Sequence, residues 1–291
     1  MANESVKIVS NFLTAEIAPH GAELRSLVDS EGRQLMTDAD PAYWTGHAPV
    51  LFPIVGRVNN DRYRQDGVEY EIPKHGFARR SHFEIVESHP ASVLFRLTDS
   101  PATRPHYPFA FALEMRFMLH ERTLSMTATV RNTGSVPMLA SFGFHPAFAW
   151  PLPFGGTKED HVVRFEHKEP GALKEISRDG LIAAEERATP VVGDTIALKD
   201  SLFSRDALVW DTLHSRALRY GVPGQPGLSI AFPDTDRLGL WMKPGARYLC
   251  IEPWAGIADP EHYDGEFRAK PGVFEVAPGD ERSFRMTVTV G

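Results

Sequence analysis

Cysteine is almost absent from this sequence, because Cys250 is the only one among 291 residues. No disulfide can form within the chain, and a metal centre held by several thiolates is excluded. The chain also contains no His-x-His or His-x-x-x-His pair with carboxylates at the usual spacing, so we expect no metal ion. A single thiol is typical of proteins in reducing compartments, and we predict a cytoplasmic location.

Long apolar runs and basic clusters are missing as well. No stretch of about 18 apolar residues is available to span a bilayer, so we expect no membrane partner. The segment from Met1 to Ser10 lacks the basic and then apolar pattern of a secretory signal. The 31 basic and 38 acidic residues are scattered along the chain, and the net charge of −7 argues against a nucleic-acid partner.

Helical periodicity is scarce, and the recurring pattern is a short β-prone segment bounded by Gly, Pro, Asp or Asn. From Leu124 to Val130 the apolar residues alternate with Ser and Thr, which places one face of a strand inward. Consecutive strands without helical segments between them favour an antiparallel, all-β sandwich. The predicted strands are Val6–Val9, Leu13–Ile17, Val68–Ile72, Val93–Thr98, Ala112–Leu119, Thr123–Asn132, Ser229–Phe232 and Ser283–Val290.

The 23 prolines and 23 glycines are spread through the chain and form no linker between two halves. We therefore predict a single domain over residues 1–291, a length that all-β sandwiches commonly reach. The hydrophobic content of 42% is enough for a core. The segment Gly155–Pro190 is the least strand-like part, and we expect long loops there.

Five segments place polar side chains inside apolar or Gly/Pro-rich surroundings, where a polar group is costly unless it is paired or used. Ordinary structural roles would account for four of them: a solvated arginine, a turn histidine, a core histidine and an aspartate at the start of a strand. In the fifth, Glu252 lies between an apolar strand and Trp254, which should raise its pKa and make it a candidate general base. The segments are Leu51–Arg57, Lys74–Arg79, Ser141–Trp150, Leu202–Trp210 and Tyr248–Trp254.

Taken together and in this order, the segments resemble the aldose 1-epimerase (galactose mutarotase) superfamily. The resemblance is closest to its bacterial branch, which bears Leu-Phe-Pro-Ile-Val-Gly-Arg, His-Gly-Phe-Ala-Arg, Gly-Phe-His-Pro-Ala-Phe and Ile-Glu-Pro-Trp. It covers nearly the whole chain, because Ala15–Ser26 is also similar to the N-terminal strand pair of the family.

The resemblance implies a β-supersandwich with a sugar in an open cleft, and an isomerase that needs no metal or organic cofactor. Glu252 would remove the proton from the anomeric hydroxyl, and His145 would protonate the ring oxygen. The ring then opens, C1 rotates, and the ring closes on the other face. His75 would assist the acid by hydrogen-bonding the ring oxygen or a neighbouring hydroxyl. Ring opening needs two groups of opposite protonation state, which a carboxylate and an imidazolium supply.

The resemblance also implies substrate contacts. Asp206 corresponds to an aspartate that binds sugar hydroxyls, and charged carboxylates are strong acceptors for that purpose. Arg57, Asn60 and Arg79 are the other expected contacts. The better-known galactose mutarotases read Gly-Arg-x-x-Asn-Arg-Ile and place their sugar-binding arginine after the asparagine, whereas this chain has Asp61 at that position.

Other functions remain open at this point. Lys74 and Arg79 flank His75 where hexose-6-phosphate mutarotases of the superfamily have phosphate-contacting residues. A carbohydrate-binding protein without catalysis could stack sugars on Trp150, Trp241 and Trp254. A metallo-hydrolase, or a sugar-phosphate epimerase or sensor on the same fold, are further alternatives. The sequence specifies neither the sugar nor the choice between a monomer and a homodimer.

Overall fold

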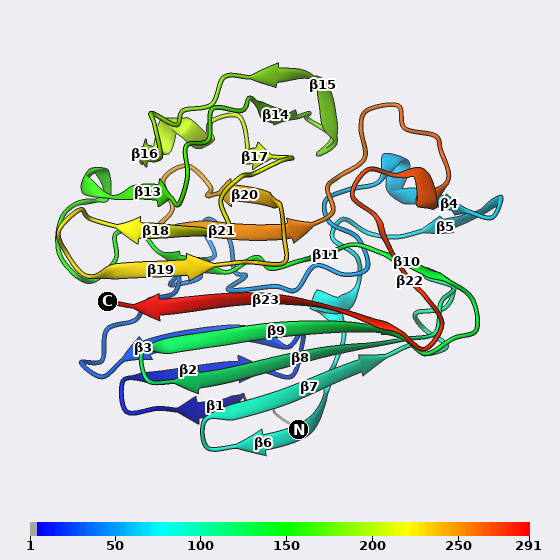
Figure 1. The fold of residues 1–291 in the computed structure, drawn as a ribbon, viewed down its shortest axis with the longest axis horizontal. Coiled ribbons are helices and arrows are strands. Elements are labelled where there is room, and N and C mark those ends of the chain that lie inside the picture. The colour runs from blue at the N-terminus through cyan, green and yellow to red at the C-terminus, as the bar shows by residue number, and fades with distance from the viewer. Residues whose placement is uncertain (1–4) are drawn as a thin grey trace.

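A computed structural model describes residues 5–291 of the chain. It is almost entirely antiparallel β-structure, which confirms the predicted fold class, and Figure 1 shows its sheets. Within this range no helix has the length and apolar character needed to cross a membrane. The helical segments of the described range are short 3-10 turns: η1 (Asn59–Asp61), η2 (Ala78–Arg80), η3 (Lys158–Asp160), η4 (Asp200–Phe203) and η5 (Phe267–Ala269).

The larger sheet has nine strands and contains the longest strands of the molecule (Figure 1). In spatial order it consists of β16 (Thr195–Ala197), β13 (Val162–Phe165), β18 (Ala217–Gly221), β19 (Gly227–Ala231), β23 (Glu281–Val290), β9 (Thr123–Asn132), β8 (Phe111–His120), β7 (Ser92–Thr98) and β6 (Glu84–His89).

A seven-stranded sheet carries most of the residues discussed below. Its strands in order are β11 (Phe142–Gly143), β21 (Tyr248–Ala255), β20 (Arg237–Trp241), β17 (Leu208–Trp210), β14 (Leu173–Ile176) and β15 (Ile182–Arg187), with β12 (Ala147–Ala149) also paired to β21. The smaller sheets are β1 (Val6–Val9), β2 (Leu13–Ala18) and β3 (Glu23–Asp29), then β4 (Arg62–Gln65) with β5 (Val68–Glu71), and β10 (Met138–Ala140) with β22 (Phe274–Val276).

Alternation decides which face of the long strands is buried. In β9 the residues Leu124, Met126, Ala128 and Val130 are buried, and the side chains between them are not. Every strand predicted from the sequence is present, and each of its ends lies within about two residues of the observed one. The strands predicted from β-prone segments, and the alternation predicted from Leu124 to Val130, are therefore confirmed.

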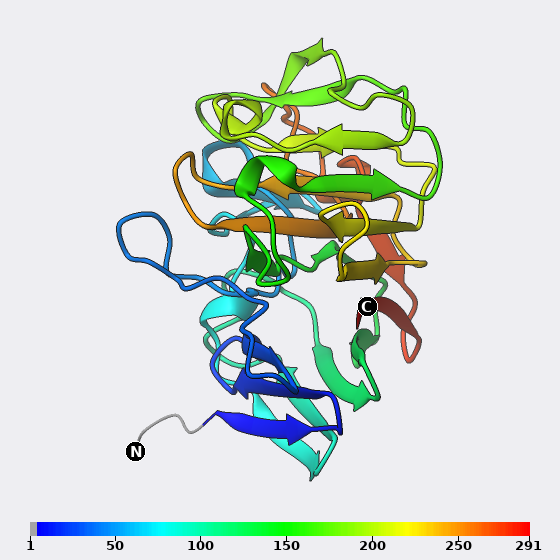
Figure 2. The same ribbon diagram turned by 90° about the vertical axis from the view of Figure 1, so that its left-hand side faces the viewer.

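Aromatic contacts join the two large sheets into a sandwich. Phe142 of the seven-stranded sheet stacks on Phe284 of the nine-stranded sheet, with ring centroids 5.2 Å apart. Phe165 and Trp210 make a second contact between the sheets at 5.5 Å. The turned view in Figure 2 shows the layers, with β1–β3, in blue at the bottom, beside the nine-stranded sheet.

The expectation of long loops from Gly155 to Pro190 was wrong in part, because β13, β14 and β15 lie within this segment. β15 ends its sheet, and most of its side chains are exposed or only partly buried. An edge strand that buries little apolar surface needs few apolar residues, so its sequence looks like that of a loop. The hairpin of β14 and β15 lines the cavity described next.

Candidate active site

Glu252 lies on β21, a strand whose eight residues are all buried. Successive side chains of a strand point to opposite faces, so Tyr248, Cys250, Glu252 and Trp254 share one face. Leu249 and Ile251, on the other face, belong to the main hydrophobic core. The apolar strand thus holds one carboxylate at a fixed depth beneath the cavity.

His145 faces Glu252 because of the register between two interrupted strands. β11 pairs Gly143 with Trp254, and β12 pairs Ala147 with Cys250. The same register carried through the gap places His145 directly opposite Glu252, on the same side of the sheet. Pro146 and Pro253 lie in this gap, and neither has a backbone N–H to donate to the opposite strand. The two strands are instead linked there by a hydrogen bond from the Ile251 N–H to the Pro146 carbonyl at 3.1 Å.

The two side chains meet at 3.2 Å, between His145 Nε2 and Glu252 Oε2. Both are buried, with 8% and 3% of their side-chain surface exposed. Burial raises the pKa of Glu252 well above its ordinary value, and burial also lowers the pKa of His145 to about 3. The free protein therefore favours the uncharged form of each group, and the pair is best described as two groups that share one proton. This differs from the imidazolium expected at position 145.

His75 is held by backbone contacts that fix its tautomer. Its own φ is 67°, and Gly76 follows at 71°, where a Cβ would lie 2.2 Å from Phe52 O. The Gly56 N–H donates to His75 Nδ1 at 3.1 Å, so Nδ1 is an acceptor and the ring proton lies on Nε2. Burial, aided by the nearby charge of Lys74, lowers the pKa of His75 well below its usual value. His75 is thus a neutral hydrogen-bond donor.

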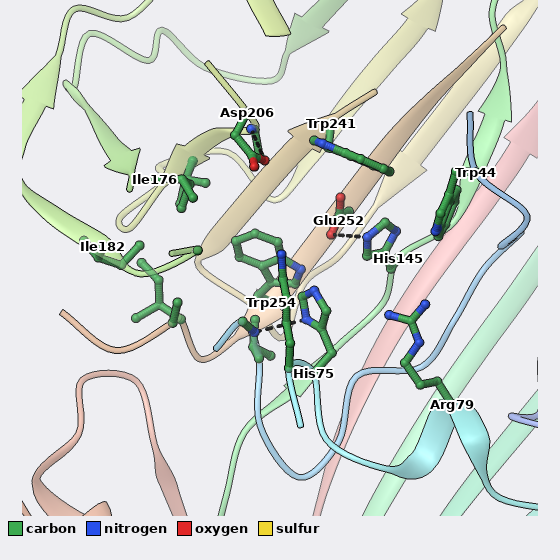
Figure 3. A pocket seen from close by; sticks show the side chains of 18 residues that line it. Trp44, His75, Arg79, His145, Ile176, Ile182, Asp206, Trp241, Glu252 and Trp254 are labelled. Atoms are coloured by element: carbon green, nitrogen blue, oxygen red, sulfur yellow. Dashed lines mark hydrogen bonds and ion pairs between the residues drawn. The ribbon is translucent and has the colours of Figure 1, made fainter. Parts of the chain in front are cut away.

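These groups line one cavity of about 220 Å³ that is open to solvent. Figure 3 shows Glu252, His145 and His75 converging on it, with Trp241 above them, Trp254 to the left and Arg79 to the lower right. The sequence-predicted residues that the cavity brings together are His75, Arg79, His145, Asp206 and Glu252.

Asp206 enters the cavity from the turn between η4 and β17. Its φ is 71°, and its Oδ1 accepts the N–H of Ala207 at 2.7 Å. Arg187 of β15 donates to the Ala207 carbonyl at 2.6 Å, which ties this turn to the edge of the sheet. The strained turn aims a carboxylate at the cavity, a type of conformation that is frequent at functional sites.

Arg57 and Asn60 lie outside the cavity lining. The Arg57 guanidinium donates to both carboxylate oxygens of Asp61 at 2.7 Å and to the Asp179 carbonyl at 3.2 Å. Asp179 belongs to the tip of the β14–β15 hairpin, so Arg57 fastens that tip beside the cavity mouth. Asn60 lines a separate cavity with Tyr63 and other residues. The prediction that Arg57 and Asn60 contact the sugar has no support from this placement.

Several cavity residues were not identified from the sequence. Trp44 lies 5.2 Å from the His145 ring and 5.4 Å from the Trp241 ring, between centroids. A tryptophan within a loop of small and polar residues was the available signal. Ile176 and Ile182 of the β14–β15 hairpin form an apolar wall, and nothing in their local sequence marks them for that position.

The chain is similar to known proteins over nearly its whole length. The model of the aldose 1-epimerase family matches residues 4–289. The chromosomal protein LacX of Lactococcus lactis subsp. lactis is 32% identical, with 98% of this chain and 99% of that protein covered. The galactose mutarotase related enzyme of Lactobacillus acidophilus is 32% identical and superposes with a TM-score of 0.89, covering 99% of this chain and 97% of its own.

A galactose mutarotase-like protein from Lactobacillus casei ATCC 334 has a TM-score of 0.91, with 99% and 100% of the two chains covered. Its identity is only 24%, so it bears on the fold alone. The family match and the two relatives at 32% identity show common ancestry in addition to a similar fold. This chain belongs to the aldose 1-epimerase family.

Proposed function

We propose that the protein is an aldose 1-epimerase that interconverts the α and β anomers of a hexose. The single observation that carries this proposal is the contact between His145 Nε2 and Glu252 Oε2 at 3.2 Å inside the cavity. The two oxygens that exchange protons during ring opening are bonded to the same carbon of the sugar. Two adjacent proton-transfer groups can therefore reach both oxygens of one hemiacetal at the same time.

Because the pair shares one proton, it can catalyse proton transfer in either direction of the reaction. With one proton between them, one member is always a base and the other an acid. In the proposed mechanism the shared proton first passes from Glu252 to His145 across their 3.2 Å contact. Glu252 then takes the proton from O1 while His145 gives its proton to O5, and the C1–O5 bond breaks. The open-chain aldehyde rotates about its C1–C2 bond, and the reverse transfers close the ring with C1 inverted. The proton count of the enzyme is the same before and after.

Other residues of the cavity would orient the sugar. His75, with its proton on Nε2, would donate to the ring oxygen or a neighbouring hydroxyl. Asp206 would accept from hydroxyls, because a charged acceptor forms short hydrogen bonds. Trp44 and Trp241 offer apolar ring faces on which a pyranose can stack. None of these contacts needs a metal or an organic cofactor in the proposed reaction.

A sugar phosphate is a second candidate substrate, and one observation favours it. Lys74 and Arg79 both line the cavity, and neither forms an ion pair with a carboxylate anywhere in residues 5–291. Two arginines near the cavity are paired with carboxylates: Arg57 binds Asp61, and Arg187 lies 3.5 Å from Glu175. Free cations in a cavity are suited to an anionic substituent.

Polarimetry tests both candidates. Freshly dissolved α-D-glucose, α-D-galactose and glucose 6-phosphate should reach their unchanged final rotations faster with the protein than without it for at least one of the three. If Lys74 and Arg79 bind a phosphate, the double substitution Lys74→Met/Arg79→Met should raise KM for glucose 6-phosphate much more than for the free sugars. Binding of sugars without any acceleration would contradict the epimerase proposal and favour the carbohydrate-binding alternative.

A further inference from the structure

A third potential metal ligand lies beside the catalytic pair. Cys250 precedes Glu252 by two residues on β21, so both side chains project from the same face of the strand. Ligand atoms of His145, Cys250 and Glu252 all lie within 4.8 Å of one another, and all three residues are buried. The proposed epimerase reaction does not use the thiol.

The three ligands match the preferences of zinc. Zn²⁺ binds imidazole nitrogen, thiolate sulfur and carboxylate oxygen, and a site with three protein ligands keeps its fourth position open. In a tetrahedral site with metal–ligand bonds of about 2.0–2.1 Å, nitrogen and oxygen ligands lie about 3.3 Å apart. His145 Nε2 and Glu252 Oε2 already have a separation of 3.2 Å. Only the thiol must shift toward the pair to complete the set.

We propose that this trio is an inhibitory site for thiophilic divalent cations, with Zn²⁺ as the preferred ion. The ion enters from the cavity, which His145 and Glu252 line, and occupies the space between these two side chains. It takes up the lone pairs that would otherwise accept and transfer protons. The predicted inhibition rests on the proposed epimerase function, whereas the predicted binding does not.

Binding must displace protons, which determines its pH dependence. The Cys250 thiol loses its proton, and the His145–Glu252 pair loses the one that it shares, so about two protons are released per ion. Burial raises the pKa of the Cys250 thiol well above its usual range, so affinity should increase as pH rises. His145 Nδ1 has no hydrogen-bond partner among residues 5–291. A hydrogen-bond partner at this outer nitrogen typically adds about 10–100-fold to metal affinity, so without one we expect weaker and reversible binding.

Cobalt provides a readout that is independent of activity. Co²⁺ added to the metal-free protein should give the intense near-ultraviolet sulfur-to-cobalt charge-transfer band of a thiolate ligand, and added Zn²⁺ should abolish it. Cys250→Ala and Cys250→Ser should both lose the band while keeping the melting temperature and the metal-free rate of mutarotation close to native. His145→Asn should also weaken cobalt binding.

Inhibition is then measured by polarimetry with increasing Zn²⁺, and EDTA should reverse it. The concentration for half-inhibition should rise at least about tenfold in Cys250→Ala, which corresponds to about 1.4 kcal/mol of binding free energy. Absence of the thiolate band, or equal inhibition of native and Cys250→Ala protein, would overturn the site. If no sugar is mutarotated but the cobalt band is present and needs Cys250, the proposed function fails and the metal site stands.

Discussion

At the scale of single residues, Glu252 is the group on which the proposed chemistry depends most. Glu252→Gln keeps the shape of the side chain and one acceptor oxygen, but the amide takes no proton near neutral pH. We expect turnover to fall by a factor of about 10² or more while sugar binding persists. Polarimetry together with quenching of tryptophan fluorescence by the sugar separates the two effects. Near-normal mutarotation of every sugar that the native protein accelerates would remove Glu252 from the role of base.

The charges around the pair predict how its pH profile moves. Positive Lys74 lowers the pKa of both Glu252 and His145, whereas negative Asp206 raises that of Glu252. The rate requires the pair with one proton, so it falls on both sides of a bell-shaped profile of kcat/KM. Lys74→Met removes a positive charge, so both pKa values should rise and the whole profile of kcat/KM should move to higher pH. Asp206→Asn removes a negative charge, so the pKa of Glu252 should fall and the side of the profile that reports Glu252 should move to lower pH.

An unphosphorylated sugar is the right substrate for this pH experiment, because it excludes direct binding of a phosphate to Lys74. The exposed Lys7 of β1 supplies a matched control, since Lys7→Met removes the same charge far from the cavity. Shifts in the same direction for Lys74→Met and Asp206→Asn would contradict the electrostatic account.

At the scale of elements, Asp259 joins the segments that form three walls of the cavity. Its carboxylate accepts the Asn59 N–H at 2.9 Å, and its own N–H donates to Arg57 O at 2.8 Å. Its carbonyl accepts the Ile182 N–H of the β14–β15 hairpin at 2.8 Å. The Lys270 ammonium neutralises it at 2.9 Å, in an ion pair whose side chains are only 1% and 4% exposed. The Gly56 segment that fixes His75 is therefore supported by a buried charge pair.

Lys270→Met should leave the Asp259 carboxylate buried without a counter-charge. We expect a loss of about 3–5 kcal/mol in the free energy of unfolding, measured by urea denaturation, and a lower kcat/KM as the His75 segment loosens. The double variant Lys270→Met/Asp259→Asn removes both charges and keeps an acceptor for Asn59. It should recover a large part of the stability, and a double variant as unstable as the single one would show that charge is not the cause.

At the scale of the whole molecule, the contact between the two large sheets tests the prediction of one domain. Phe284 is fully buried and packs against Phe142 of the opposite sheet and against Phe274, each at 5.2 Å. Phe284→Ala should cost about 3–5 kcal/mol, because the cavity that it leaves lies between rigid sheets. Calorimetry should show one cooperative transition at a lower temperature than native. Two transitions, only one of which moves, would contradict a single domain.

The proposed reaction needs no metal, and chelation of the whole protein tests this expectation. Exhaustive treatment with EDTA should leave the rate of mutarotation unchanged, or raise it if zinc occupied the site that contains Cys250. Loss of activity on chelation, with recovery on adding zinc, would instead favour a metal-dependent enzyme.

The sequence by itself determined the fold class and one central candidate, Glu252. The alternation from Leu124 to Val130 is a local property, because side chains two residues apart share a face whatever the rest of the chain does. Glu252 was identifiable because its apolar neighbours have to bury it. The resemblance carried by the motifs added His75, His145, Arg79 and Asp206, and the cavity gathers all of these residues.

Only the tertiary structure decided how these groups meet. The position of His145 opposite Glu252 depends on the register of β11 and β12 against β21, which is set by contacts between distant segments. Arg57 is held away from the cavity by Asp61 and the Asp179 carbonyl, and the latter comes from a hairpin that the sequence did not reveal. The uncharged state of His145 is likewise a result of burial. Local patterns specify which face of a strand is apolar, but long-range pairing and desolvation decide which polar groups share one cavity and where their protons lie.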